Sequence, residues 1–242
     1  MNADAPARRP RLFDLGSAPA FPERGAVLAG DGGFPARRVL LDIGATAVPT
    51  GTAQLQAGEG AIDGHPRSEF ILVTRGRLTL HSCAGLSDLR PGDAAVIPQG
   101  AAFRWAAADD LEFVFQTYAG PADGDAPVAV DPDAALEPSP GPDASLLTTP
   151  APRCGKRVVQ ASADGEWTVG VWASTPGGRR AITYAHTELM HLLAGSVTLT
   201  DASGEARTFA AGSTFLVPRG AVYAWNNDVP VRKVYVSHRP RG

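Results

Sequence analysis

Two glutamates occupy matching places in the chain, each at the start of an apolar run. Glu69 precedes Gly76 by seven residues in EFILVTRG, and Glu188 precedes Gly195 by seven residues in ELMHLLAG. A carboxylate can bind a cation, which we consider for Glu69, or can transfer protons where apolar surroundings raise its pKa, which we consider for Glu188. We therefore take Glu69 and Glu188 as the first candidates for chemistry.

The segments around the two glutamates repeat each other. Five features recur in the same order: the glutamate, the glycine seven residues later, a glycine that precedes a proline by six residues, the Pro-x-Gly run itself and a tryptophan seven residues after the proline. Glu69 and Glu188 lie 119 residues apart, whereas Trp105 and Trp225 lie 120 apart, so one residue was gained in the intervening hairpin. Five ordered matches indicate a tandem duplication of one domain.

The elements that position these residues are expected to be strands. Gly, Pro and Asp punctuate both halves at intervals of about 8–12 residues, which is typical of a β-sandwich or barrel. Both faces of the run that begins at Glu188 are largely apolar, so we expect this strand to be covered on both sides. The sequence predicts an all-β protein with an N-terminal arm at 1–35, an N-terminal domain at 36–120, a Pro/Asp/Ala-rich linker at 121–154 and a C-terminal domain at 155–242.

The composition argues against several classes of function. The net charge of −3 provides no basic field for nucleic acid or an anionic membrane, and no apolar run approaches the roughly 20 residues that span a bilayer. The N-terminus lacks the apolar segment of a secretory signal, and Cys83 and Cys154 form neither a CxxC motif nor a disulfide framework. Phosphate-loop and nucleophile-elbow motifs are missing from the sequence as well. We expect a cytoplasmic protein that binds neither nucleic acid nor membrane.

The Glu-to-Gly run followed by G-x5-P-x-G resembles the paired motifs of the cupin superfamily, H-x-H-x(3,4)-E-x6-G and G-x5-P-x-G-x2-H-x3-N. The duplication therefore resembles a bicupin, which implies two tandem cupin (jelly-roll β-barrel) domains and a homodimer that covers exposed sheet edges. The runs WTVGVW and VRKVYV in the second half look most like the subgroup that contains ureidoglycine aminohydrolase and the ethanolamine-utilisation cupin. One fold hosts many activities, so this resemblance predicts architecture better than chemistry.

In the first half, the family's metal-ligand slots fall on Asp63, His65, Glu69 and Phe103. Asp63, His65 and Glu69 could together hold a cation, whereas Phe103 could not. One imidazole with two carboxylates favours a harder divalent ion such as Mn²⁺, and ureidoglycine aminohydrolase is manganese-dependent. The alternative is that Asp63 and His65 form a solvated turn, with Glu69 paired to Arg67 or Arg104.

In the second half, the same slots hold Thr183 or Tyr184, then Glu188, Tyr223 and Asn227, and we expect no metal there. Glu188 and Tyr223 would be the catalytic residues of a metal-free acid–base site. The alternative is that Tyr223 only holds Glu188 in the barrel by a hydrogen bond. The candidate ligand-binding residues, which share an expected place at a barrel mouth, are His186, Tyr184, Trp225, Asn227 and Phe103.

Two further alternatives stay open. Trp105 and Trp225 could close the barrels by packing, or Trp225 could line a ligand site. Arg179 and Arg180 lie in a Pro-Gly-Gly turn, where solvent exposure is expected, with recognition of a carboxylate as the alternative.

Three functions are compatible with these residues. The first is a bicupin that binds a small polar metabolite in one or both barrels. The second is an enzyme that resembles ureidoglycine aminohydrolase and carries a divalent metal, Mn²⁺ or similar, in the N-terminal barrel. The third is metal-free isomerisation or epimerisation at Glu188 and Tyr223. The loss of metal ligands in both halves favours the first.

Overall fold

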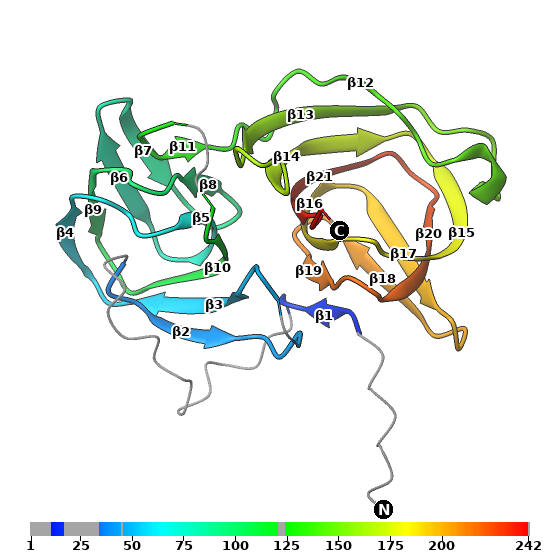
Figure 1. Ribbon diagram of the computed structural model, residues 1–242, viewed down its shortest axis with the longest axis horizontal. Helices are drawn as coiled ribbons and strands as arrows, with labels where there is room; N and C mark the ends of the chain where they lie inside the picture. The colour runs from blue at the N-terminus through cyan, green and yellow to red at the C-terminus, as the bar shows by residue number, and fades with distance from the viewer. Residues whose placement is uncertain (1–10, 17–33, 45, 121–123, 242) are drawn as a thin grey trace, which may run out of the picture.

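In this computed structural model, which describes residues 11–16, 34–44, 46–120 and 124–241, the chain forms two β-barrels that lie side by side (Figure 1). Each barrel combines one large sheet with one four-stranded sheet. This arrangement confirms the predicted all-β fold of two tandem jelly-roll domains. No helix in the described part of the chain is long and apolar enough to cross a membrane.

The N-terminal barrel consists of a six-stranded sheet in the order β11-β8-β5-β10-β3-β2 and a four-stranded sheet in the order β4-β9-β6-β7. Its strands are β2 (Arg37–Leu40), β3 (Thr50–Leu55), β4 (Gly58–Ile62), β5 (Ser68–Arg75), β6 (Leu78–Ser82), β7 (Gly85–Leu89), β8 (Ala94–Ile97), β9 (Phe103–Ala107), β10 (Leu111–Tyr118) and β11 (Val128–Ala129).

The C-terminal barrel consists of a seven-stranded sheet in the order β1-β19-β16-β21-β14-β13-β12 and a four-stranded sheet in the order β15-β20-β17-β18. Its strands are β1 (Phe13–Asp14), β12 (Glu137–Ser139), β13 (Cys154–Ala161), β14 (Trp167–Ser174), β15 (Gly177–Thr183), β16 (Thr187–Ala194), β17 (Ser196–Asp201), β18 (Ala206–Ala210), β19 (Thr214–Val217), β20 (Val222–Asn227) and β21 (Val231–His238).

The duplicated glycines lie at the turns that follow the two glutamate strands. Gly76 and Gly195 have φ angles of 82° and 78°, in the left-handed region that favours glycine. A Cβ atom on Gly195 would lie 2.1 Å from the carbonyl oxygen of Pro230, so a side chain is excluded sterically as well. The repeated glycine therefore marks the same backbone turn in both barrels, as the sequence predicted.

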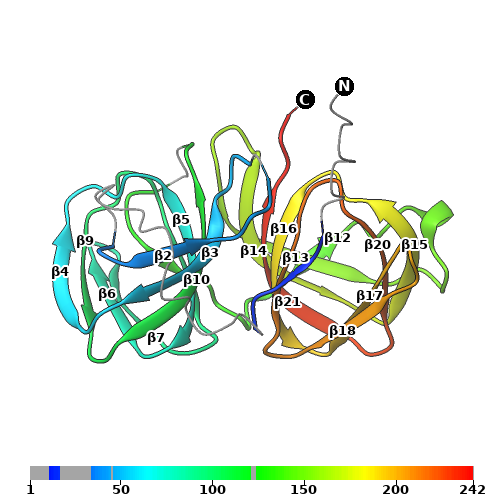
Figure 2. The same ribbon diagram turned by 90° about the horizontal axis from the view of Figure 1, so that it is seen from below.

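The two strands that carry the motif glutamates, β5 and β16, each contribute side chains to two hydrophobic cores. Along β5, Phe70 and Leu72 belong to a buried cluster between the barrels, whereas Ile71 belongs to the interior of the first barrel. Along β16, Leu189 joins the same inter-barrel cluster, whereas Met190 faces the interior of the second barrel. This explains why both strands are apolar on both faces: the outer face of each large sheet packs against the other barrel (Figure 2).

Both the arm and the linker are partly built into the sheets. In the arm, β1 pairs with β19, and Asp14 forms a 3.0 Å ion pair with Arg207; the rest of the predicted arm, residues 1–10 and 17–33, lies outside the described residues. In the linker, β11 pairs with β8, β12 pairs with β13, and a short 3-10 helix spans Ala144–Leu146. The linker therefore adds an edge strand to each barrel instead of only joining them.

Candidate functional site

In the first barrel, Glu69 is fully buried and ion-paired. Arg38 from β2 donates to both of its carboxylate oxygens, at 3.2 Å for Nη2 and Oε2, and His65 Nε2 lies 3.1 Å from Oε2. Burial alone would raise the pKa of Glu69, but the Arg38 and His65 contacts outweigh it and lower the pKa to about 2. Glu69 is therefore an ionised structural carboxylate, not a proton donor.

Aromatic rings fill the rest of that interior. The Arg38 guanidinium lies 4.5 Å from the ring centroid of Phe115 and 5.9 Å from that of Phe113. Phe103, a candidate ligand-binding residue, is buried and packs against Phe34 at 5.6 Å between ring centroids. Phe103 is thus part of the hydrophobic core of the barrel.

The residues of the first barrel do not fit a metal ion. Asp63 is exposed, so the structure brings His65 and Glu69 together without the third predicted ligand. Within the described residues, no group of three or more His, Cys, Asp or Glu side chains is placed to hold a metal. The guanidinium of Arg38 supplies the positive charge that balances Glu69, in place of the predicted divalent ion.

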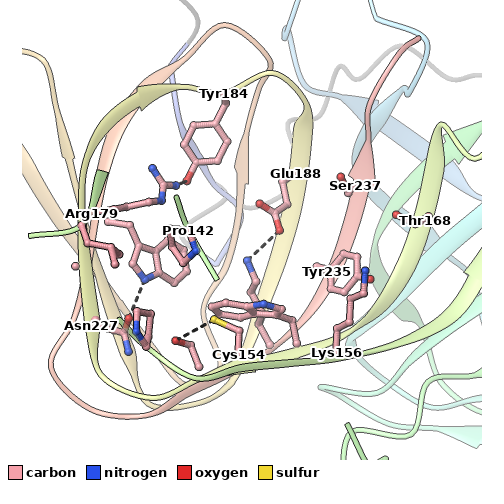
Figure 3. A pocket seen from close by; sticks show the side chains of 18 residues that line it. Pro142, Cys154, Lys156, Thr168, Arg179, Tyr184, Glu188, Asn227, Tyr235 and Ser237 are labelled. Atoms are coloured by element: carbon pink, nitrogen blue, oxygen red, sulfur yellow. Dashed lines mark hydrogen bonds and ion pairs between the residues drawn. The ribbon is translucent and has the colours of Figure 1, made fainter. Parts of the chain in front are cut away.

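The second barrel contains a cavity of about 350 Å³ (Figure 3). It is bounded by strands of both sheets and by the end of the linker. Its charged lining residues are Lys156, Arg179, Glu188 and Lys233; its larger apolar and aromatic ones are Leu147, Trp172, Tyr184, Trp225 and Tyr235; its smaller ones are Pro142, Pro152, Cys154, Thr168, Ser174, Gly177, Gly178, Asn227 and Ser237. A mainly apolar wall with a few polar groups is typical of a small-molecule site.

Glu188 lies in this cavity and forms an ion pair with Lys233. The Nζ atom of Lys233 is 2.9 Å from Glu188 Oε1, a contact drawn in Figure 3. The same ammonium lies 4.9 Å from the ring centroid of Trp172 and 5.0 Å from that of Trp225, within the range of cation–π attraction. Lys233 is only 5% exposed, so carboxylate and rings replace the water that it loses.

The ionisation state of Glu188 differs from the sequence-based expectation. Burial does favour the neutral acid, but Lys233 and His186, whose Nε2 lies 3.4 Å from Oε2, outweigh it and hold the pKa well below its ordinary value. The expectation of a raised pKa at this residue was wrong because the sequence did not reveal Lys233 as its partner. A carboxylate with so low a pKa is a weak base and does not supply a proton near neutral pH.

Tyr223 is not among the residues that line the cavity. Its hydroxyl accepts a 3.1 Å hydrogen bond from the backbone N–H of Leu12, in the N-terminal arm. The proposed catalytic pair of Glu188 and Tyr223 is therefore not assembled in one cavity. Tyr184, in contrast, does line the cavity. Its hydroxyl accepts a 2.9 Å hydrogen bond from Arg179.

Three more candidate residues lie at or near the cavity with different roles. Trp225 forms part of the wall and donates from Nε1 to Asn227 Oδ1 at 2.9 Å. The Asn227 amide donates in turn to the carbonyls of Thr175 and Val229, so Asn227 positions Trp225. His186 contacts Glu188, with 3.4 Å between Nε2 and Oε2, but does not line the cavity.

The linker covers one side of the cavity through two glycines of β15. The backbone N–H of Thr148 donates to the carbonyl of Gly178 at 3.0 Å, and the N–H of Gly178 donates to Thr149 Oγ1 at 2.8 Å. A Cβ atom on Gly178 would lie 2.7 Å from Thr148 Oγ1, and one on Gly177 would lie 3.0 Å from the Pro152 ring. Glycines are needed here because the linker passes so close to the strand.

Sequence reasoning missed Lys156, Lys233 and the linker as parts of the site. A signal for Lys233 was present in VRKVYV, because the period-2 alternation of a strand places it on the same face as Val231 and Tyr235. The expected Pro-Gly-Gly turn is instead the beginning of β15, which brings Arg179 to the cavity and leaves Arg180 exposed. No comparable signal marked the linker, whose role depends on tertiary packing.

The comparisons with known proteins agree with this architecture. Residues 161–235 match the EutQ-like cupin domain. A protein of unknown function from Pseudomonas syringae pv. tomato has a similar structure, with a TM-score of 0.82 and 28% identity over 95% of this chain and 100% of that one. No curated protein matches the chain.

Two other solved structures share the fold at low identity. A cupin 2 conserved barrel domain protein from Leptotrichia buccalis has a TM-score of 0.62 and 8% identity, over 98% of this chain and 100% of that one. Protein Ylba from E. coli has a TM-score of 0.57 and 14% identity, over 96% of this chain and 91% of that one. Together with the two barrels described above, these matches show that the chain has a two-domain cupin fold; the match to the EutQ-like cupin domain covers part of the second barrel.

Proposed function

We propose that this protein binds a small polar metabolite in the cavity of its second barrel, without a metal ion. The observation that carries the proposal is the contrast between the two interiors. The second barrel keeps a cavity of about 350 Å³ between Trp172, Trp225 and several polar groups. In the first barrel, Arg38 and a cluster of phenylalanines occupy the corresponding interior, which gives that domain a structural role.

A manganese-dependent activity like that of ureidoglycine aminohydrolase finds less support in the residues. In each barrel a protein cation, Arg38 or Lys233, already neutralises the motif glutamate. A metal ion at either glutamate would be repelled by that cation and would lack further anionic ligands. The low pKa of Glu188 and the position of Tyr223 likewise count against acid–base isomerisation by this pair.

Thermal unfolding in the presence of a broad panel of neutral, anionic and cationic metabolites tests the proposal. A ligand that binds only the folded state raises the melting temperature, and at 100 times its Kd it adds about 2.7 kcal/mol of stability. We expect at least one class of metabolite to do so, also in protein treated with EDTA.

The variant Trp225→Ala should abolish this stabilisation. Trp105→Ala is the matched control, because Trp105 occupies the equivalent place in the first barrel and the two side chains are 7% and 8% exposed. We expect the control to lower the melting temperature of the free protein and to keep the ligand response. A panel without any stabilising compound, or a response that the control loses and Trp225→Ala retains, would contradict the proposal.

A further inference from the structure

We infer that the metabolite bound in the second barrel is a small dicarboxylate, one acidic group of which is recognised by Arg179 and the other by Lys156. The inference rests on the proposed function and names the ligand class of the same cavity. The geometry that supports it is the distribution of charge on the cavity wall, where cations outnumber carboxylates.

The wall carries three basic side chains and one acidic side chain: Lys156, Arg179, Lys233 and Glu188. Lys233 and Glu188 neutralise each other at 2.9 Å, so the net charge of +2 comes from Lys156 and Arg179. Within the described part of the chain, neither of these two forms an ion pair with a carboxylate, whereas the adjacent Arg157 faces Glu137 at 3.8 Å. The cavity therefore has positive charge that its own residues do not balance.

Contacts with Tyr184 and Tyr223 fix the Arg179 side chain, and some of its N–H donors remain available to a ligand. Its Nη2 donates to the Tyr184 hydroxyl at 2.9 Å, its guanidinium carbon lies 5.3 Å from the centroid of that ring, and Nη1 makes a long 3.4 Å contact with the carbonyl of Tyr223. A guanidinium has five N–H donors, so these contacts leave several for a ligand. A planar, fixed guanidinium is well suited to a carboxylate, which it can bind through two parallel hydrogen bonds.

The two unbalanced cations lie on different walls. Figure 3 shows Arg179 beside Tyr184 on one side of the cavity and Lys156 beside Tyr235 on the other, with Glu188 between them. An anion with acidic groups at both ends could reach both cations while its middle lies along Trp172 and Trp225. A neutral ligand would leave both charges unmatched, and a cationic one would be repelled, because Glu188 is already paired.

Isothermal titration calorimetry at low salt tests the ligand class with matched probes. Malonate, succinate and glutarate have the same carbon chains as malonamide, succinamide and glutaramide, but carry two charged carboxylates in place of two neutral amides. We expect binding of at least one dicarboxylate, no comparable binding of its diamide, and weaker binding as salt screens the charges.

Variants locate the binding groups. Arg179→Gln should weaken binding of the best dicarboxylate by about tenfold to a hundredfold, as expected for loss of a charged hydrogen-bond donor. Lys156→Gln tests the second contact at an exposed position, where folding is not at risk. Arg180→Gln is the matched control, because Arg180 is the exposed neighbour of Arg179 on the same strand, and it should bind as the parent does.

The outcomes separate this inference from the proposed function. Dicarboxylate binding that falls in Arg179→Gln and Lys156→Gln but not in Arg180→Gln supports both. If the metabolite panel yields only neutral or cationic ligands that depend on Trp225, or if the dicarboxylates bind equally well to all variants, the anion inference is overturned and the binding function stands. If no compound of any charge binds, the proposed function itself fails.

Discussion

In both barrels the motif glutamate is neutralised by a cation, but the cation comes from different strands. The sheet registers show equivalent positions: Phe113 on β10 lies opposite Val73, and Lys233 on β21 lies opposite Leu192, each four residues after the motif glutamate. On their other sides, Phe113 lies opposite Ala53 and Lys233 lies opposite Trp172. Phe113 thus stands where Lys233 stands in the other domain. The Phe113 ring helps to fill the interior of the first barrel. In the second barrel the Lys233 ammonium binds Glu188, and a cavity lies beside this pair.

The same comparison explains the surplus charge of the cavity. One strand further along each sheet, Arg38 lies opposite Ala53 and Lys156 lies opposite Trp172. Arg38 must bind Glu69, because its own barrel has no lysine on β10. Lys156 does not pair with Glu188, because Lys233 already neutralises that carboxylate. Lys156 therefore lines the cavity without a carboxylate partner there among the described residues.

Replacing Lys233 by Met should destabilise the protein strongly. The change leaves Glu188, whose side chain is 14% exposed, without its main counter-charge. Breaking a largely buried ion pair in this way typically costs about 3–5 kcal/mol. Urea unfolding at pH 7 measures the loss. The double variant Lys233→Met/Glu188→Gln should be more stable than Lys233→Met alone, because it removes the unpaired charge; equal stability of the two variants would contradict the pairing.

Glu69 should make the free energy of unfolding depend on pH in acidic solution. Its pKa is lowered from 4.5 to about 2, so the folded state prefers the ionised form. The resulting stabilisation, of about 3 kcal/mol, is fully present above the unfolded-state pKa and is lost as the pH falls from about 4.5 towards 2. Urea unfolding between pH 7 and 3 should show a smaller loss in Glu69→Gln than in the parent; parallel curves would show that Glu69 is not involved.

At the scale of elements, the linker is a component of the site as well as a connection. Its β12 extends the seven-stranded sheet, and the segment after it passes over Gly177 and Gly178 to close one wall of the cavity. A Pro-rich segment is suited to this task because it holds an extended path with few donors to satisfy. The cavity therefore depends on a segment that lies outside both repeated domains.

Gly178→Ala should loosen this cover. The added Cβ would lie 2.7 Å from Thr148 Oγ1 and 2.9 Å from Asn226 Oδ1, so the linker or the strand must shift, at a cost of about 1–3 kcal/mol. We expect weaker ligand binding and faster protease cleavage within residues 142–153. Gly64→Ala is the control, since a Cβ there meets nothing within 4 Å, and it should change neither property.

The sequence predicted the elements better than the site. The duplication, the β-rich blocks and the glycine turns are visible because they depend on local backbone preferences and on repeated spacing, as at Gly76 and Gly195. The partners of the glutamates are not, because Arg38 and Lys233 approach them from strands 31 and 45 residues away. The partner of the Tyr223 hydroxyl could not be predicted either, because its donor is the backbone N–H of Leu12, in the distant arm.

At the scale of the whole molecule, the two barrels share one core. Trp167 is fully buried between them; its Nε1 donates to Gln116 at 3.1 Å, and its ring stacks on Tyr118 with centroids 6.1 Å apart. The Tyr118 hydroxyl donates to Asp164 across the same interface at 2.5 Å. A filled first barrel can thus act as a rigid support for the cavity in the second.

We also expect the protein to form a homodimer in solution. Strands β2 and β12 lie at the ends of the two large sheets, and unpaired sheet edges are commonly covered by a partner. Light scattering coupled to size-exclusion chromatography should give a mass twice that of the 25.1 kDa chain. A mass equal to one chain across the concentration range would contradict this expectation.

Hydrogen–deuterium exchange with the most stabilising metabolite, on protein treated with EDTA, measures the location of the ligand. We expect slower exchange on β13 to β16, β20, β21 and residues 142–153, and unchanged exchange throughout β2 to β10. Slower exchange confined to the first barrel, or an effect that appears only after a divalent metal is added, would contradict the proposed function.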